Sequence, residues 1–506
     1  MLRRIATVAL ICQPAAAMRP TRRQALKGTA GSTVMLNFLP GAARAAAKGF
    51  GLPSKETNDV VTTVDGIRRK RLGNSDIAVS ELALGTQRWG GADFNSPDEE
   101  LCHQLLDRGV LEGGINLIDT AEQYPIPSDR TRPEGATEEI IGRWLKKGSG
   151  RRNKVVLASK ITGGRNINKR SIREDCEGSL KRLGVDTLDV YLLHWPARYT
   201  PQSNWGQSLE YDWDLGAITV PSAASFREIV AAMGELIKEG SPQCHTLRQI
   251  RTRVAQAKSE AMGPVTTTPW DSWVARQCRS QRVNLHAVDA SSHTGMYGAA
   301  RELGVPGPLC MQNDYSIVNR RVEENGLSEA SSPALANAGF MAYNVLAGGM
   351  LTGKYGLTPN DGIAPAAVDD GDRTRAKKFS EAPRGRMDTR GWGLTLGRYR
   401  TTAMRSAAAQ YTKLAKEYGI KGGLTELSFR FVAGRKAVTS SLVGHTSLAQ
   451  LDASIDAYRK AAKGPLDPQL LWDIDRVHLQ NRLPLFANDE EGKDWRGEGF
   501  IGERIP

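Results

Sequence analysis

The chain has 506 residues, 40% of them apolar and 24% charged. This balance excludes disordered and collagen-like proteins and provides enough apolar residues for a large core. No run of about 18 apolar residues occurs, so no transmembrane helix is expected. The cysteines lack CxxC spacing, which indicates isolated thiols and neither a disulfide framework nor a zinc site: Cys12, Cys102, Cys176, Cys244, Cys278 and Cys310.

The net charge of +13 is concentrated in two segments. Residues 1–48 hold eight Lys or Arg and no acidic residue, and residues 241–282 hold seven basic and two acidic residues. These two segments account for the whole net charge, so the rest of the chain is neutral. Because a nucleic-acid-binding surface places its positive charge on the folded domain, we expect no nucleic-acid partner.

The first residues have the pattern of a targeting sequence, which we assign to residues 1–47. Arg22-Arg23 opens a twin-arginine signal, an apolar stretch follows, and Ala43-Arg44-Ala45 offers a small-residue cleavage site. A basic, acid-free leader precedes Met18, as in the bipartite presequence of a thylakoid-lumen protein. We therefore expect the chloroplast, with the thylakoid lumen as destination. A bacterial periplasmic protein starting at Met18 and a basic disordered tail are the alternatives.

After a polar linker at residues 48–68, short apolar runs alternate with amphipathic stretches. Short runs that are apolar on both faces, each followed by a helical pattern, predict parallel strands covered on both sides. A doubly wound sheet and a closed barrel both satisfy this order. The expected strands are 81–86, 116–120, 155–160, 187–194, 309–313, 341–346 and 440–444. The expected helices are 98–112, 137–147, 171–183, 225–239, 402–418, 424–434 and 447–461.

Polar residues decide between the two folds. No GxGxxG follows the first strand, so the dinucleotide signature of a doubly wound fold is missing. Asp119, Lys160, His194 and Gln312 each lie at the C-terminal end of an expected strand, which is the active-site face of a (β/α)8 barrel. We therefore predict an α/β fold with a TIM barrel over residues 69–465 and a C-terminal extension over 466–506.

Six motifs in chain order resemble the aldo-keto reductases, in the bacterial and plastid branch that keeps His-Trp-Pro. The resemblance runs from about Arg69 to Arg459. It implies NADP(H)-dependent reduction of aldehydes or ketones to alcohols, a small-molecule carbonyl substrate and no metal. The motifs are Asp119-Thr-Ala-Glu-Gln-Tyr124, Ala158-Ser-Lys160, Leu193-His194-Trp-Pro196, Gln312-Asn-Asp-Tyr315, Ala347-Gly-Gly-Met-Leu-Thr-Gly-Lys354 and Val443-Gly-His-Thr-Ser447.

The resemblance assigns catalysis to Asp119, Tyr124, Lys160 and His194. Tyr124 would be the proton donor, and Lys160 would lower the pKa of this phenol, which is ordinarily about 10. Asp119 would keep Lys160 charged, and His194 would orient the carbonyl. The cofactor-binding residues implied by the resemblance are Thr86, Asp119, Gln312, Tyr343, Leu346, Ala347, Lys354, Gly444, Thr446 and Gln450.

Two cofactor segments depart from the family pattern. Ala453 and Ser454 stand where relatives often have Glu-Asn, which predicts a weaker hold on the adenine end. Tyr343-Asn344-Val345 lacks the usual Ser-Pro after the aromatic residue. His445-Thr446-Ser447 offers hydroxyls and a largely neutral imidazole but no fixed cation, so we expect NADP(H) to be preferred over NAD(H) less sharply than in relatives with a basic residue there.

Residues 241–297 break the family pattern most clearly. The family's fifth strand ends in Gly-Leu-Ser-Asn, and no convincing strand stands here. Gly263–Trp270 places Val265 and Thr266 at the Ser-Asn positions, and Ser291–Thr294 is a second candidate. Valine cannot hydrogen-bond a carboxamide, and Pro264 removes a strand donor. Either a surface insertion or a mis-spliced segment would explain this departure from the family pattern. A disrupted fifth strand would favour an alternative function, that of a cofactor-binding, reductase-like regulatory or interaction subunit with little catalytic activity.

Overall fold

The computed structural model describes one compact unit within residues 52–506. The described residues are 55–92, 96–195, 197, 213–214, 217, 223–239, 283–286, 290–355, 385–386, 399, 401–482 and 484. The targeting segment expected at residues 1–47 lies outside them, as do residues 241–282.

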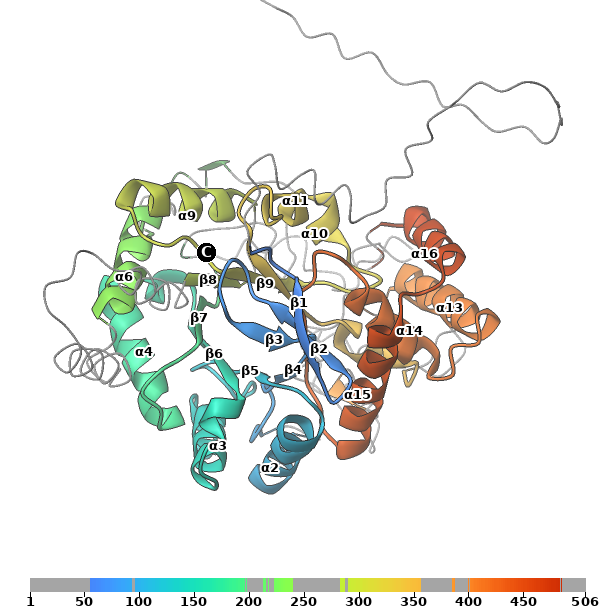
Figure 1. Cartoon of the computed structure of the whole chain (residues 1–506), viewed down its shortest axis with the longest axis horizontal. Helices are drawn as coiled ribbons and strands as arrows, with labels where there is room; N and C mark the ends of the chain where they lie inside the picture. The colour runs from blue at the N-terminus through green and yellow to red at the C-terminus, as the bar shows by residue number, and fades with distance from the viewer. Residues whose placement is uncertain are drawn as a thin grey trace, which may run out of the picture. The chain divides into compact units, whose positions relative to one another are not determined.

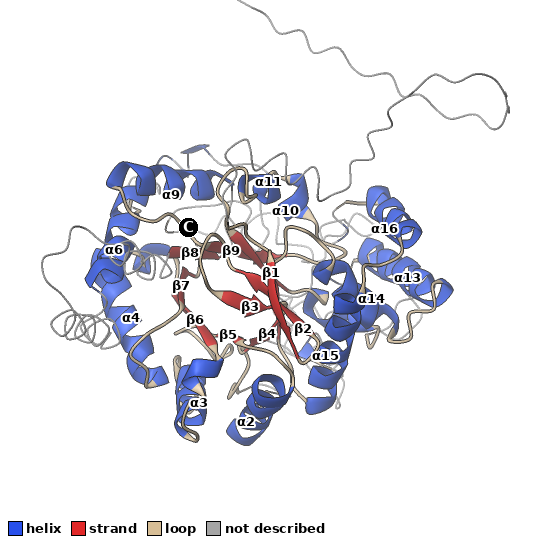
Figure 2. Cartoon of the chain, in the orientation of Figure 1, coloured by secondary structure: helices blue, strands red, loops and turns tan. Residues whose placement is uncertain are grey.

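Eight parallel strands close into a barrel, which confirms the predicted fold. The seven strands expected from apolar runs all form, because residues buried on both faces of a parallel strand must be apolar. Figure 2 shows the strands at the centre, with helices around them. In sheet order the strands are β10 (Gly339–Tyr343), β11 (Ser440–Val443), β4 (Leu82–Gly85), β5 (Leu117–Asp119), β6 (Val156–Ile161), β7 (Val190–Leu193), β8 (Val283–His286) and β9 (Cys310–Asp314).

The seven expected helices also form, with ends that agree within two residues except for the first. That segment divides into α2 (Glu99–Leu106) and a π-helical turn (Asp107–Glu112). The others are α3 (Ala136–Lys146), α4 (Lys169–Leu183), α6 (Phe226–Glu239), α13 (Thr402–Glu417), α14 (Gly423–Ala433) and α15 (Leu448–Lys463). Three further helices cover the barrel or flank it: α9 (Ala290–Leu303), α10 (Arg321–Glu324) and α11 (Leu327–Ala330).

Side-chain caps fix where several helices begin. The Asp98 carboxylate accepts a hydrogen bond from Leu101 N at 2.9 Å, and Asn168 forms a capping box with Ser171. Ser447 caps α15 by accepting from Gln450 N. Each cap satisfies backbone N–H groups that have no partner within the helix and so fixes where that helix begins.

The fifth barrel strand corrects the expectation for residues 241–297. β8 forms at Val283–His286 and pairs in parallel with β7 and β9, which closes the barrel. Neither candidate segment is this strand, because Ser291–Thr294 lies in α9 and Val265–Thr266 lies outside the described residues. The expectation of a missing strand was therefore wrong.

A small antiparallel sheet covers the end of the barrel opposite the strand C-termini. It consists of β1 (Val60–Val64), β2 (Ile67–Arg71) and β3 (Ala78–Ser80), and lies in front of the barrel in Figure 1. Lys70 Nζ donates to Val438 O at 2.9 Å, and Ser80 N donates to Asn116 Oδ1 at 2.7 Å, both just before barrel strands. Residues 48–68, expected to be a linker, thus contain β1 and the start of β2.

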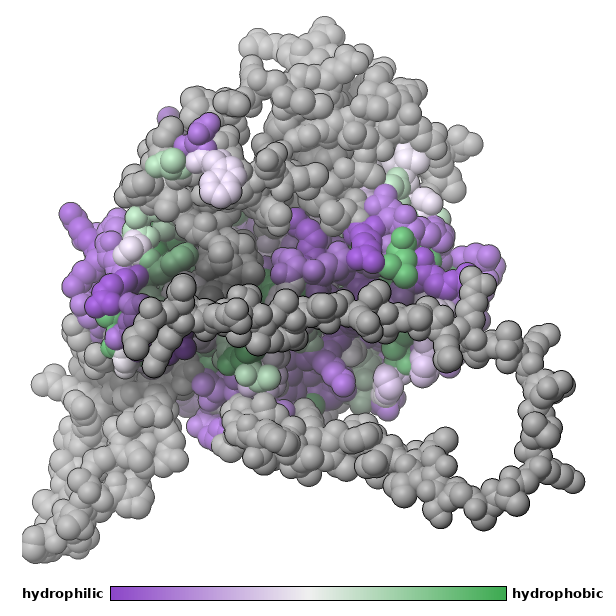
Figure 3. Space-filling model, turned by 90° about the horizontal axis from the view of Figure 1, so that it is seen from above, coloured by the Kyte–Doolittle hydropathy of each residue, from purple (hydrophilic) through white to green (hydrophobic). Residues whose placement is uncertain are grey.

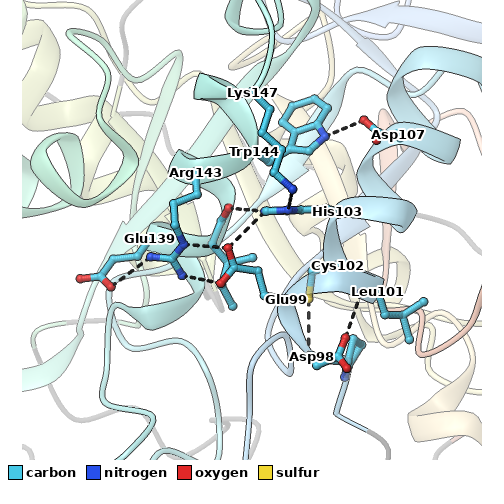
Figure 4. Close-up of polar contacts among 12 residues, drawn as sticks. Asp98, Glu99, Leu101, Cys102, His103, Asp107, Glu139, Arg143, Trp144 and Lys147 are labelled. Carbon is cyan, nitrogen blue, oxygen red and sulfur yellow. Dashed lines mark hydrogen bonds and ion pairs between the residues drawn. The ribbon is translucent and has the colours of Figure 1, made fainter.

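A polar network joins α2 to α3 (Figure 4). His103 Nε2 lies 3.0 Å from Ile140 O and therefore carries the ring proton, and Nδ1 accepts from Lys147 Nζ at 2.6 Å. Arg143 bonds both carboxylate oxygens of Glu99 at 2.8 and 2.9 Å. The contacts of His103 and Glu99 with residues of α3 and its C-terminal end hold the two helices together.

The C-terminal extension contains α16 (Pro468–Gln480), which packs beside α13 and carries the exposed side chains of Trp472 and Leu479. Figure 3 shows hydrophilic and hydrophobic residues interspersed over the described part of the face that it displays. Among the helices of the described residues, none has the length and apolar character needed to span a bilayer.

Candidate active site

Four polar side chains meet at the C-terminal ends of the barrel strands. Asp119 ends β5, Lys160 lies near the end of β6, His194 follows β7 and Gln312 lies in β9. All four are nearly inaccessible to solvent. The strand register places Asp119 opposite Ala158 and Lys160 opposite Leu192, so the side chains approach one another inside the barrel mouth.

Lys160 is the centre of the cluster and is fully buried. Its Nζ donates to Asp119 Oδ2 at 2.7 Å, to Thr120 O at 2.8 Å and to the Tyr124 hydroxyl oxygen at 3.3 Å. An ammonium group has three donors, and all three are used here. Lys160 therefore has a fixed position between an acid and a phenol.

Tyr124 is positioned by the loop between β5 and α3. Its N–H donates to Ala121 O at 3.1 Å, and its carbonyl accepts from Gly135 N at 2.9 Å at the start of α3. The Tyr124 ring lies edge to face with His194, with centroids 5.7 Å apart. The phenol is thus set between Lys160 on one side and the imidazole on the other.

The pKa of Tyr124 beside Lys160 differs in its net direction from the expectation. Burial raises the pKa of Tyr124 above its ordinary value, and the Lys160 cation opposes this rise without cancelling it. Burial acts to lower the pKa of Lys160, but Asp119 and Tyr124 outweigh it and raise the pKa overall. Lys160 lowers the phenol's pKa as expected, yet the net direction is upward. At neutral pH the phenol is therefore protonated and the amine is charged.

Asp119 connects three strands of the barrel. Its Oδ1 accepts from Gln312 Nε2 at 2.9 Å, across the barrel interior, while Oδ2 bonds to Lys160. The Thr86 hydroxyl donates to Asp119 O at 2.9 Å, at the end of β4. Gln312 still has its carbonyl oxygen and a second amide hydrogen, which are the groups a carboxamide could pair with.

The expected pyrophosphate loop follows β10. Tyr343 ends that strand, and Leu346 is partly buried beside the core. Ala347, Gly348 and Gly349 have φ values of 49°, 64° and 99°, so three consecutive residues adopt the left-handed conformation. Successive N–H groups in such turns point into a concave backbone surface that binds anions. Lys354 adds an exposed positive charge to the same loop.

The start of α15 is the expected site of the adenosine phosphate. The Gln450 side chain accepts from Thr446 N at 3.0 Å, and Gly444 lies at the end of β11. His445 cannot serve a phosphate as expected, because it is 2% exposed and bonds to Ser454 Oγ at 2.9 Å. Burial lowers the pKa of His445 to about 3, so this ring is neutral. Ser454 is 2% exposed and its hydroxyl is used in this contact.

These segments fit a nicotinamide dinucleotide held without a Rossmann domain. The amide of Gln312, the left-handed turns after Leu346 and the N-terminus of α15 offer, in turn, groups for a carboxamide, a pyrophosphate and a further phosphate. Each of these segments thus offers groups that match one polar part of a dinucleotide.

Sequence reasoning missed a second buried cluster at the barrel mouth. Asp314 Oδ2 accepts from the Tyr399 hydroxyl at 3.0 Å and from Asn344 Nδ2 at 3.3 Å. This ties the end of β9 to the loop after β10, where the family's Ser-Pro is absent. Asn344 stands at the position of the family's serine and has a φ of 56°, a left-handed conformation that asparagine adopts more readily than most other residues. The Asn344 substitution was a visible signal, but its partner Tyr399 was not.

No three His, Cys, Asp or Glu side chains among the described residues are arranged to hold a metal ion. Within the same residues, Cys102, Cys176 and Cys310 form no disulfide bond. Burial raises the pKa of Cys176 to about 12, so its thiol is unreactive at neutral pH.

Comparisons with known proteins bear on this site. The model of the aldo/keto reductase family matches residues 81–278 and 287–475, and β8 lies within the unmatched gap. "Protein tas" of Escherichia coli (strain K12) is 30% identical over 425 residues, covering 82% of this chain and 98% of that protein. An "Aldo-keto reductase" of Babesia bovis is 25% identical over 66% of this chain and 99% of its own length. "Uncharacterized oxidoreductase YrpG" of Bacillus subtilis is 28% identical over 61% and 76%.

Proposed function

Since the chain belongs to the aldo/keto reductase family, we propose that it is an NADP(H)-dependent enzyme that reduces aldehydes or ketones to alcohols, with Tyr124 as proton donor. Family membership makes it an oxidoreductase that acts on small carbonyl compounds with a nicotinamide cofactor. The choice of NADP(H) and the roles of individual residues are the proposal.

The observation that carries the proposal is the position of Lys160 Nζ, 2.7 Å from the Asp119 carboxylate and 3.3 Å from the Tyr124 hydroxyl. A buried cation beside a phenol has little structural value, because both groups lose hydration on burial. It has a clear chemical value, because it stabilises the phenolate left when the phenol gives up its proton.

The proposed reaction adds a hydride to the carbonyl carbon and a proton to the carbonyl oxygen. The nicotinamide, when bound, supplies the hydride. Tyr124 supplies the proton, and the raised pKa of its hydroxyl keeps that proton in place at neutral pH until the oxygen becomes negative. Lys160 then lies beside the new phenolate, with its own charge maintained by Asp119.

His194 would orient the substrate. Its ring lies 5.7 Å from that of Tyr124, centroid to centroid, and packs against Trp195 at 4.9 Å. A carbonyl oxygen between the phenol and the imidazole would meet donors from two directions, which lowers the barrier as negative charge develops there. The alternative of an inactive binding subunit rested on a disrupted fifth strand, and β8 removes that argument.

The test is Tyr124→Phe, assayed with NADPH and a reactive aldehyde, with Tyr418→Phe as control. Tyr418 donates to Asp473 at 2.7 Å away from the barrel mouth, so its variant loses a tyrosine hydroxyl without affecting the site. Loss of a general acid lowers the rate on the order of a hundred- to ten-thousand-fold. NADPH binding should be nearly unchanged. A Tyr124→Phe enzyme with half the original turnover would remove Tyr124 from the mechanism.

We also propose that residues 1–47 direct the protein to the thylakoid lumen by the twin-arginine route. Arg22-Arg23 and the cleavage pattern at Ala43-Arg44-Ala45 support this. That route carries proteins already folded, which suits an enzyme that would bind its nucleotide before crossing the membrane.

A further inference from the structure

The loop that follows β5 continues alongside β6 beyond the end of its own strand. Thr120 N donates to Ala158 O at 2.9 Å. Two residues later, Glu122 N donates to Lys160 O at 3.2 Å. The side chain of Glu122 adds a further contact, because its Oε1 accepts from Thr162 N at 2.5 Å. Glu122 therefore holds the end of β6 through both its backbone and its carboxylate.

Glu122 lies close along the chain to both partners of the proposed proton transfer. Tyr124 follows it by two residues, and Thr162, whose N–H it binds, follows Lys160 by two residues. The contact between Lys160 Nζ and the Tyr124 hydroxyl, at 3.3 Å, is the longest of the three that the ammonium makes. A small shift of the loop along β6 would break it, because a separation of about 3.6 Å is no longer a hydrogen bond.

The surroundings of the Glu122 side chain favour an oxygen acceptor over a negative charge. The side chain is partly buried, and its carboxylate meets a backbone N–H. Burial raises the pKa of the carboxyl, and Asp175 adds to this rise, while the Thr162 N–H and Arg182 oppose it. The oxygen of an uncharged amide could therefore take over the contact with Thr162.

We propose that Glu122 is a positioning residue, which keeps the Tyr124 phenol at hydrogen-bond distance from the Lys160 ammonium by tying the loop after β5 to the end of β6. This inference rests on the proposed function. The contacts of Glu122 are with the backbone of Lys160 and Thr162, so it acts on the proton donor through the loop. Because misplacing a reacting group by about 1 Å can lower a rate about 100-fold, loss of this tie should lower kcat.

The test measures kcat and KM with benzaldehyde, and the affinity and stoichiometry of NADPH binding, in Glu122→Ala, Glu122→Asp and Glu122→Gln. Ser159→Ala is the control, because Ser159 donates to Glu138 on α3 at 2.6 Å and its variant loses a buried contact of β6 without touching the loop. Glu122→Ala should lower kcat on the order of 10- to 100-fold, with KM and NADPH binding little changed. Glu122→Gln should stay within about threefold of wild type, since its amide oxygen still accepts from Thr162 N. Glu122→Asp should fall between them, because its carboxylate is one methylene short of Thr162.

Two results would overturn the inference. If Glu122→Asp were more active than Glu122→Gln, the negative charge would matter and not the reach of the acceptor. If Glu122→Ala lost activity only in proportion to its NADPH-binding sites, or no more than Ser159→Ala, Glu122 would serve stability alone. Should Glu122→Ala fail to fold, the comparison of Asp with Gln still decides, since both keep a polar acceptor.

Failure of the proposed function is a separate outcome. If the wild-type chain reduces no aldehyde, the reductase proposal fails, and amide hydrogen exchange measured by mass spectrometry tests the tie on its own. Faster exchange in peptides covering residues 119–124 and 160–164 of Glu122→Ala, with wild-type exchange in Glu122→Gln, supports the tie. Exchange in these peptides that is the same in all the Glu122 variants refutes it.

Discussion

Replacing Lys160 by methionine tests whether the buried pair at the barrel mouth is as tightly coupled as its geometry indicates. The change removes the cation while nearly keeping the volume of the side chain. It leaves the Asp119 carboxylate, 4% exposed, with a side-chain hydrogen bond from Gln312 Nε2 at 2.9 Å. Thr120 O and the Tyr124 hydroxyl lose a charged partner at the same time.

The main cost of this substitution in folding free energy comes from leaving the Asp119 carboxylate buried without its cation. Breaking a buried ion pair by removing one partner destabilises a protein by about 3–5 kcal/mol, whereas the apolar gain of burying methionine is about 1.5–3 kcal/mol at most. Because the larger figure is measured with such gains included, we expect a net loss of about 3 kcal/mol or more. Combining the change with Asp119→Asn removes both charges and keeps an acceptor for Gln312, so the double variant should be more stable than Lys160→Met alone.

Urea unfolding of the cofactor-free chain, followed by tryptophan fluorescence, measures these differences. Coincidence with circular dichroism must be checked, since a chain of this size can unfold in steps. Lys154→Met is the matched control, because Lys154 is exposed just before β6 and should change stability by about 0.5 kcal/mol or less. A loss for Lys160→Met no larger than that of the control would refute the coupled pair.

The pH of this measurement follows from the direction of the Lys160 shift. The pKa of Lys160 in the folded chain is raised above its ordinary value. Its contribution to stability is therefore fully present below the unfolded-state pKa of about 10.4, and is lost only as the pH rises through the folded-state value. Neutral pH captures the whole effect, and the contrast should be constant between about pH 6 and 9.

Three other predictions follow from the site and the N-terminus. The kcat/KM for carbonyl reduction should be level from about pH 6 to 9, because burial raises the pKa of Tyr124 above its ordinary value of about 10 and keeps the acid protonated; a decline starting near neutral pH would contradict this. Fluorescence titration at about pH 8, where the 2′-phosphate is fully ionised, should show tighter binding of NADPH than of NADH, with no contribution from a charged His445, since burial lowers the pKa of His445 to about 3; equal affinities would reject the preference. Changing Arg22 and Arg23 to lysine should block export of the precursor in an import assay, because the pathway recognises the arginine pair itself; unchanged import would exclude a twin-arginine signal.

The barrel and the four catalytic candidates could be predicted because their signals are local. Asp119 and Lys160 each interrupt an apolar run at its C-terminal end, and in a parallel barrel all such ends lie on one face. Contacts between distant segments gave no such signal. Arg386 and Gln87 are 299 positions apart, and Arg386 stands in a stretch with several other arginines. Nothing in the local sequence of Arg386 indicates its contact with Gln87.

The fifth strand was missed for a different physical reason. Apolar runs and the family's Ser-Asn ending are the signals that predict such a strand, whereas Val283-Asn-Leu-His286 alternates apolar and polar residues over four positions. In a fully covered parallel barrel such alternation is unusual, so the segment resembles a loop when read alone. The closure of the barrel supplies the missing constraint. Without β8, the strands β7 and β9 are too far apart to pair, and the seven remaining strands would form an open sheet with two unpaired edges. The short strand forms because β7 and β9 present backbone N–H and C=O groups to it on both sides. Leaving those groups without hydrogen bonds would cost more free energy than placing four residues of weak strand propensity in the sheet.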